Sequence, residues 1–262
     1  NWGDLVLPGY ESHLVPNIAA KVKHKLQIKN PACVAYDVLF GCPGWLQCMI
    51  QASYYLKSGD ARNILVIGAE TISRIVDPHD MDSMLFSDGA GATVLQGQPD
   101  EADRGIVYHK TISNCMEEID FLKMGPSNNT EISEHDVRLK MDGKKVFKYG
   151  YQEIPPLIME GIQAAQIDPA ARIYVLIHQA NSKMVMAIVE RFRELYGRDP
   201  ELNLIVPDII EKMGNNSVAT IPVLLNQLNR GELAHETPQP GDVLILSSVG
   251  AGMHANVVVY KV

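Results

Sequence analysis

Short apolar runs alternate with longer amphipathic stretches along most of the chain. Residues 63–70 (NILVIGAE) and 173–181 (IYVLIHQAN) each contain an unbroken apolar run, which is typical of strands buried on both faces. Residues 43–59 and 182–197 instead repeat apolar positions at helical spacing, and each stretch ends at a glycine. This alternation predicts an α/β fold with a largely parallel sheet.

The other predicted elements continue the alternation. We expect further strands at 33–40, 91–97 and 104–114, and two more within 242–262 that are joined by a turn of small residues. Further helices are expected at 17–27, 146–167 and 217–233. Pro155 and Pro156 must kink or divide the second of these helices, because proline lacks the backbone N–H that a helix uses. The longest irregular segment is 123–145, and no linker-like stretch separates independent domains.

The composition is that of a globular protein, with 46% of the 262 residues hydrophobic and 21% charged. The net charge of -8 argues against wholesale nucleic-acid binding. No apolar run reaches the ~18 residues that a membrane-spanning helix needs. The four cysteines show neither a CxxC nor a zinc-ligand spacing, so we expect reduced thiols, no metal site and a cytoplasmic protein. The chain starts without Met and without a signal peptide, and we expect it to begin inside a longer natural chain.

Cys42 occupies the junction between a predicted strand and a predicted helix, in the sequence GCPGW. The free N–H groups and the positive dipole end of a helix N-terminus favour a thiolate there. Gly41 lets the chain turn sharply before the cysteine, as in a nucleophile elbow. The alternative is a small buried residue at a strand–helix junction.

Two further polar sites follow predicted strands in the second half. His178 ends an apolar strand, where ligands gather in α/β sheets, although a satisfied core histidine is the alternative. In MGNNSVATIP (213–222), Gly214 supports a tight turn, Asn215 offers a side-chain amide, and Ser217 could cap the helix that follows. A loop with a helix cap is the alternative there. The small-residue turn VGAGMHA (249–255) could point a backbone N–H at an oxyanion.

Taken together, these motifs resemble the thiolase-fold condensing enzymes, and the ketoacyl-ACP synthase III group above all. The resemblance rests on GCPGW, HQAN, GNNSVATIP and a terminal GAG in that order, supported by KSGDARNILVIGAE, DGAGATVL and MDGKKVF. It implies a five-layer αβαβα fold of two similar halves, 1–115 with the nucleophile and 116–262 with His and Asn. It also implies a homodimer, and that the first βα units of the N-terminal half are absent from this sequence.

The resemblance further implies a Cys-His-Asn triad. Cys42 would take an acyl group from acyl-CoA, and His178 and Asn215 would bind the carbonyl oxygen of a malonyl-type thioester as it decarboxylates. The backbone N–H groups of Cys42 and Ala251 would hold the tetrahedral oxyanion. No metal or resident cofactor is implied, because CoA and phosphopantetheine thioesters are the substrates.

Weaker correspondences concern the route to the site. Gly143, Phe147 and Asn181 match positions that line the pantetheine tunnel. Lys148 and Lys183 match basic positions where an acidic acyl carrier protein docks, and three further lysines add positive charge nearby: Lys140, Lys144 and Lys145. A solvated lysine-rich loop is the alternative for these three.

Other functions remain open at this stage. The chain could serve a secondary pathway that makes a resorcinol or polyketide-type product. A type III polyketide or hydroxymethylglutaryl-type synthase fits HQAN and GNNS less well. A non-catalytic partner subunit of a heterodimeric ketosynthase would be expected to have lost the nucleophile, and this chain retains Cys42.

Overall fold

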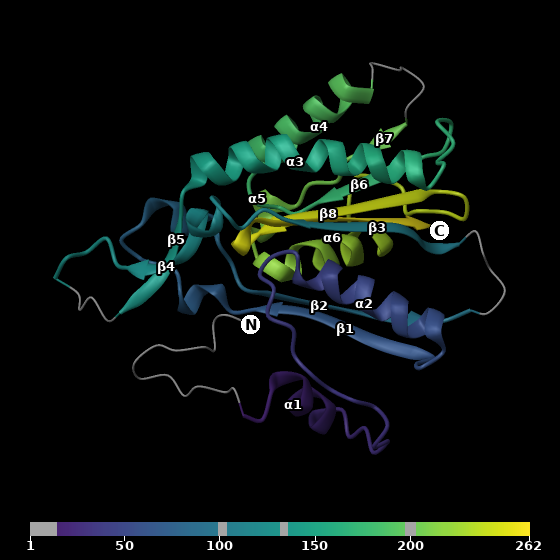
Figure 1. Ribbon diagram of the computed structural model, residues 1–262, viewed down its shortest axis with the longest axis horizontal. Helices are drawn as coiled ribbons and strands as arrows, with labels where there is room; N and C mark the ends of the chain where they lie inside the picture. The colour runs from purple at the N-terminus through teal and green to yellow at the C-terminus, as the bar shows by residue number, and fades with distance from the viewer. Residues whose placement is uncertain (1–14, 99–103, 132–135, 197–202) are drawn as a thin grey trace.

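The computed structural model describes residues 15–98, 104–131, 136–196 and 203–262. Helices α3 (Gly143–Ala164) and α4 (Ser182–Tyr196) form the first layer, and a five-stranded sheet lies beneath them (Figure 1). Helices α2 (Gly44–Ser58) and α6 (Thr220–Asn229) form the third layer, above a two-stranded sheet. The α/β prediction is confirmed, and the described residues supply four of the five expected layers.

The larger sheet is mixed. Its strand order is β3-β9-β8-β6-β7. The strands are β3 (Gly105–Ser113), β6 (Ile173–Ile177), β7 (Leu204–Ile205), β8 (Val243–Gly250) and β9 (His254–Lys261). Among the described strands of this sheet, β6 pairs in parallel with β7 and β8, while β8–β9 and β3–β9 are antiparallel. The prediction of a largely parallel sheet was wrong, because the three-residue turn between β8 and β9 can only reverse the chain.

Strand β6 shows why its sequence is uniformly apolar. Ile173, Val175 and Ile177 pack into the core beneath α3 and α4. Tyr174 and Leu176 pack into a second core on the side of α2 and α6. A strand covered by helices on both faces has no polar side, so the period-2 pattern disappears.

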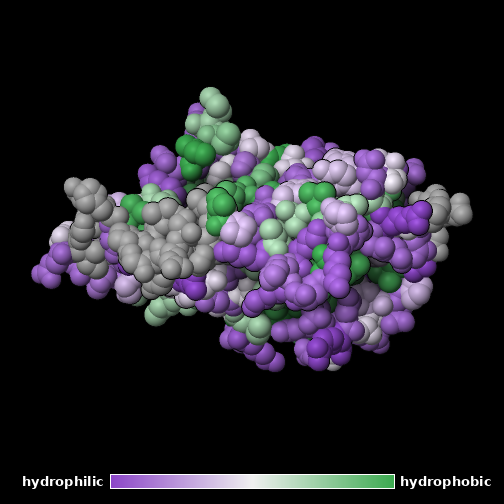
Figure 2. Space-filling model, turned by 90° about the horizontal axis from the view of Figure 1, so that it is seen from below, coloured by the Kyte–Doolittle hydropathy of each residue, from purple (hydrophilic) through white to green (hydrophobic). Residues whose placement is uncertain are grey.

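The smaller sheet pairs β1 (Asn63–Glu70) with β2 (Gly89–Gln96) in antiparallel register. We expected residues 63–70 to be a central parallel strand. The 18-residue connection contains only short 3₁₀ turns, so nothing carries the chain across the sheet for a parallel pairing. Leu65, Ile67 and Val94 are exposed on the side away from α2 and α6. Figure 2 views the molecule from below and shows apolar side chains among hydrophilic ones.

Residues 33–40 are not a strand. The backbone from 34 to 40 has no ladder partner among the described strands, and Val34, Tyr36 and Leu39 are each more than half exposed. An apolar run makes a strand only where a neighbour supplies the hydrogen bonds. This segment follows α1 (Ile18–Lys25) and leads directly to Cys42.

The remaining helices differ from expectation in two places. Helix α3 runs without interruption through Pro155 and Pro156, so the prolines do not divide it (Figure 1). Helix α6 starts at Thr220 and follows a 3₁₀ turn at 217–219. A single-turn helix, α5 (Ile210–Met213), precedes this region.

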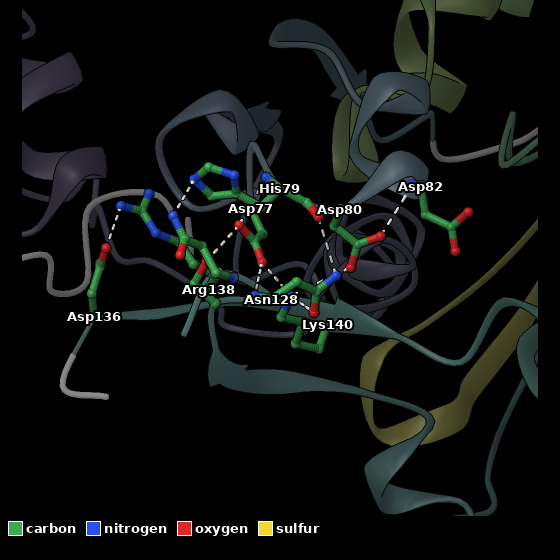
Figure 3. Close-up of polar contacts among 10 residues, drawn as sticks. Asp77, His79, Asp80, Asp82, Asn128, Asp136, Arg138 and Lys140 are labelled. Atoms are coloured by element: carbon green, nitrogen blue, oxygen red, sulfur yellow. Dashed lines mark hydrogen bonds and ion pairs between the residues drawn. The ribbon is translucent and has the colours of Figure 1, made fainter. Parts of the chain in front are cut away.

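Part of the expected irregular segment 123–145 is a hairpin of β4 (Leu122–Pro126) and β5 (Val137–Met141). Lys140 on β5 makes an ion pair with Asp77, whose side chain is fully buried (Figure 3). Burial alone would raise the pKa of Asp77, but Lys140 and the backbone N–H groups of Asn128 and His79 hold that pKa far below its usual value. The hairpin is therefore fixed to the 71–88 connection by a paired, hydrogen-bonded charge.

The boundary between the two halves stays a prediction. Strand β3, residues 105–113, falls within 1–115 by that division, yet it pairs with β9 in the larger sheet.

Candidate active site

Cys42 sits on a tight turn immediately before α2. Gly41 has φ +66°, a left-handed conformation that glycine adopts readily, and its carbonyl accepts the Gly44 N–H at 2.9 Å. Pro43 is the N-cap residue of α2, so Cys42 lies one residue outside the helix. The sharp turn predicted from Gly41 is confirmed.

Ser217 brings the cysteine together with Asn215. The Ser217 hydroxyl lies 3.4 Å from the sulfur of Cys42. The backbone N–H of Ser217 donates to Oδ1 of Asn215 at 3.0 Å. Because Oδ1 accepts this bond, the Nδ2 group is the end of Asn215 that remains to donate to a ligand.

Ser217 also connects to the histidine. Its carbonyl accepts the Thr220 hydroxyl at 2.8 Å, and the same hydroxyl lies 2.5 Å from Nδ1 of His178. His178 and Asn215 are 4% and 5% exposed. The structure therefore gathers Cys42, His178 and Asn215 around one short segment, 217–220.

The thiolate expected at Cys42 is not favoured in this site. Burial raises the pKa of Cys42 to about 11, and the carboxylate of Glu70 adds to the rise, while the Ser217 hydroxyl opposes it. The residue keeps some exposed surface, yet protein surrounds the sulfur. Cys42 lies directly before the N-cap of α2, and desolvation is the largest effect on its pKa.

His178 is a neutral imidazole near pH 7. Burial lowers the pKa of His178 to about 4. Its backbone N–H donates to the Ser247 carbonyl at 2.8 Å, which fixes the residue at the end of β6. A neutral ring with Nδ1 already bonded to Thr220 presents Nε2 to any ligand.

The turn between β8 and β9 packs directly on the nucleophile. A methyl group added to Gly250 would lie 2.9 Å from both the backbone nitrogen and Cβ of Cys42. The backbone nitrogen of Ala251 lies 3.4 Å from the position that a Cβ of Gly41 would take. Asn256 on β9 donates its Nδ2–H to the Pro43 carbonyl at 3.0 Å. These contacts hold the backbone N–H groups of residues 42 and 251 on adjacent segments.

The three expected tunnel residues have structural contacts of their own. Asn181 precedes α4 and its Oδ1 accepts the Met184 N–H at 2.8 Å, as a helix cap does. Phe147 on α3 packs against the core beneath α3 and α4. Gly143, the first residue of α3, lines an open hollow of about 720 Å³ together with Asp82 and Lys144.

The expected docking lysines lie near one helix crossing. Helices α3 and α4 approach so closely at Gly150 that a Cβ there would meet the terminal methyl group of Met184. Lys148 and Lys183 are exposed, each within two residues of this crossing. Lys140 does not add free positive charge as expected, since it is paired with Asp77 and Asp80.

The residues that connect the site were not identified from the sequence. Ser217 was expected to cap the helix, but it makes no such cap and turns toward Cys42 with φ +50°. Thr220 and Asn256 were not singled out at all. The signal available was the run of small polar residues beside Asn215, which a cap alone does not need.

Two findings concern the described residues only. Their helices include none that combines the length and apolarity needed to cross a membrane. No cluster of three or more His, Cys, Asp or Glu side chains within them could hold a metal ion.

Two family models match the chain. Residues 36–114 match 3-oxoacyl-[acyl-carrier-protein] synthase III, and residues 162–262 match the C-terminal model of the same family. The chain belongs to the synthase III family. The matched segments contain Cys42 in the first and His178 and Asn215 in the second.

Relatives agree with this synthase III assignment. The chain is 32% identical over 244 residues to a β-ketoacyl-[acyl-carrier-protein] synthase III of Prochlorococcus marinus, covering 90% of this chain and 68% of the relative. It is 33% identical to the synthase III of Rhodospirillum centenum, covering 90% and 69% of the two chains. The chain is therefore an acyl-transferring condensing enzyme of the class that serves fatty acid biosynthesis.

Solved structures of synthase III enzymes share the fold. The enzyme from Thermus thermophilus superposes with a TM-score of 0.77 at 29% identity, covering 95% of this chain and 73% of that one. The enzyme from Aquifex aeolicus gives 0.77 at 27% identity, covering 93% and 71%. The thiolase-like α/β fold is thus confirmed.

Proposed function

We propose that this synthase III chain catalyses a decarboxylating Claisen condensation between acyl-CoA and a malonyl-type thioester on acyl carrier protein. The acyl group moves first to Cys42, and carbon–carbon bond formation then releases it. The observation that carries the proposal is the Ser217-centred cluster, which joins one thiol, one neutral imidazole and one oriented amide.

Acyl transfer needs a nucleophilic sulfur and a site for the oxyanion. A thiol whose pKa is about 11 requires a base at the moment of attack, and neutral His178 suits that task. The N–H groups of Cys42 and Ala251 are the proposed oxyanion donors. Their fixed positions, set by the Gly250 and Asn256 contacts, cost no reorganisation during the reaction.

Condensation needs hydrogen-bond donors at a developing enolate oxygen. We assign this role to His178 and to Nδ2 of Asn215, whose Oδ1 is already held by Ser217. Loss of one such donor typically raises the activation free energy by about 3 kcal/mol. The bond to CO2 breaks as its electron pair becomes the enolate, which attacks the acyl group on Cys42 and expels the sulfur.

We also propose residues that bind the substrates on their way to Cys42. Gly143, Phe147 and Asn181 are the proposed contacts of the pantetheine arm. Lys148 and Lys183 are proposed to dock the acidic carrier protein, supported by their exposure near one helix crossing. We further propose a cytoplasmic homodimer that uses no resident cofactor.

The test measures acylation and decarboxylation separately, with acyl-CoA and malonyl-carrier protein as substrates. We expect N215A to retain acylation of Cys42 and to lose CO2 release by about 100-fold or more. The exposed N226A on α6 is the matched control and should behave as wild type. Equal CO2 release from N215A and N226A would contradict the proposed role of Asn215.

A further inference from the structure

Thr220 contacts two groups through one hydroxyl. Its Oγ1 lies 2.8 Å from the Ser217 carbonyl oxygen and 2.5 Å from Nδ1 of His178. Thr220 is only 1% exposed, and all of these partners are buried. A hydroxyl has a single proton to donate, so the two contacts cannot both receive it.

The chemistry of the carbonyl decides the direction of both bonds. The Ser217 carbonyl can only accept, so the contact at 2.8 Å is a bond only if Thr220 donates to it. The Thr220 oxygen then has only lone pairs to offer His178, and Nδ1 must carry the proton. The reverse arrangement would place two acceptors face to face in a buried site, which costs about 1–3 kcal/mol.

We propose that Thr220 is a positioning residue that holds neutral His178 in the tautomer with its proton on Nδ1. Nε2 is then an unprotonated acceptor when the enzyme is at rest. The catalytic meaning of this tautomer rests on the proposed function. The bond pattern itself, from Nδ1–H to Thr220 to the Ser217 carbonyl, does not.

The tautomer assigns an order to the proton movements. As the sulfur of Cys42 attacks acyl-CoA, its S–H bond breaks and an N–H bond forms at Nε2. The CoA thiolate leaves and takes a proton from solvent, and the negative charge of the malonyl carboxylate that binds next holds His178 as an imidazolium against the burial that keeps it neutral at rest. Its new Nε2–H is then the donor that the enolate requires. When condensation expels the sulfur of Cys42, that thiolate takes the proton back, and both groups return to their resting forms.

The alternative is that Thr220 only packs the buried site. The two models differ for substitutions of similar shape. T220S keeps the hydroxyl and removes the methyl group, whereas T220V keeps the methyl group and replaces the hydroxyl with a second one. A packing role makes T220S the more harmful change, and the tautomer role makes T220V the more harmful one.

Nitrogen-15 NMR of the histidine side chains tests the proposal directly. The spectrum of the full chain at pH 7 is compared with that of H178Q to assign His178. We expect a pyrrole-like Nδ1 and a pyridine-like Nε2 in wild type and in T220S. In T220V we expect loss of this pattern and a Cys42 acylation rate, with acyl-CoA as probe, at least about 10-fold lower.

A pyridine-like Nδ1 in wild type would overturn the proposal, as would T220V with the wild-type pattern and acylation rate. If T220V fails to fold, the wild-type and T220S spectra still decide the tautomer. If wild type takes no acyl group at all, the proposed function fails while the NMR result stands by itself.

Discussion

The hydroxyl of Ser217 lies 3.4 Å from the sulfur of Cys42, although 175 positions separate the two residues in the chain. The contact joins the N-terminal end of α2 to the turn before α6. The backbone N–H of Ser217 donates to Asn215, and its carbonyl accepts from Thr220, which in turn contacts His178. Ser217 is therefore linked to all three candidate catalytic residues. The geometry of the site therefore depends on how this single turn folds.

The first prediction concerns the side chain of Ser217. S217A removes only the hydroxyl and leaves both backbone contacts in place. The hydroxyl opposes the rise in the pKa of Cys42, so its loss should raise that pKa further. We expect alkylation of Cys42 by iodoacetamide at pH 9 to slow about fivefold, because one hydrogen bond contributes about 1 kcal/mol to the stability of the thiolate. Peptide mass spectrometry measures the rate at Cys42, with Cys48 as the internal control. Unchanged alkylation of Cys42 would show that the contact has no electrostatic effect.

The second prediction concerns the close approach of Gly250. In G250A the added methyl group would lie 2.6 Å from Cδ of Pro43 and 2.9 Å from Cβ of Cys42, so the turn must move. Residue 250 has φ -169°, which alanine adopts freely, so the effect is steric alone. We expect acylation to fall at least about 10-fold, because a small misplacement of reacting groups is costly.

G97A is the control for this variant, since a Cβ there meets its nearest neighbour at an ordinary 3.5 Å. Its acylation rate should equal that of wild type. A G250A variant as active as G97A would mean that the turn does not position Cys42.

The third prediction concerns pH and stability. Burial lowers the pKa of His178 to about 4 in the folded chain, whereas an unfolded histidine titrates near 6.5. Between these values the unfolded state binds a proton that the folded state does not, so the free energy of unfolding falls as the pH drops. We expect the titration of His178 to lower the free energy of unfolding by about 3 kcal/mol as the pH falls from 7 to 4.

Urea unfolding of wild type and H178Q at several pH values isolates this contribution. H178Q cannot titrate, so its curve should be flatter than that of wild type between pH 6.5 and pH 4. Parallel curves would rule out a buried neutral His178.

The fourth prediction concerns the ion pair beneath the β4–β5 hairpin. K140M leaves the buried carboxylate of Asp77 without its cation, which should cost about 3–5 kcal/mol in the free energy of unfolding. K123M, directly opposite in the hairpin register and half-exposed, should cost less than about 1 kcal/mol. The double variant D77N/K140M should recover part of the loss in urea unfolding. Equal stability of K140M and K123M would contradict the buried pair.

Much of the site could be predicted because its residues sit at the ends of apolar runs. Cys42 and His178 are polar positions at such ends, and the turn at Gly41 follows from a glycine beside a helix start. The sequence could not reveal that Ser217 points toward Cys42, because its direction depends on a left-handed φ that serine rarely adopts.

The sequence predicted most helices and strands correctly, but it did not predict which strands pair with one another. An apolar run such as 63–70 indicates a buried strand, but its partner depends on the connection that follows. Residues 33–40 show the converse, since an apolar run without a neighbouring strand stays irregular and exposed. The elevated pKa of Cys42 likewise arises mainly from burial, with a smaller contribution from Glu70, and no local pattern connects either cause to the cysteine.

The most direct measurement is the mass of the Cys42 peptide after the purified chain is incubated with an acyl-CoA panel. One acyl group should appear on Cys42 in wild type and in C48A, and none on that peptide in C42A. An acyl group found on Cys33, Cys48 or Cys115 instead, or on no cysteine with any member of the panel, would contradict Cys42 as the acyl acceptor.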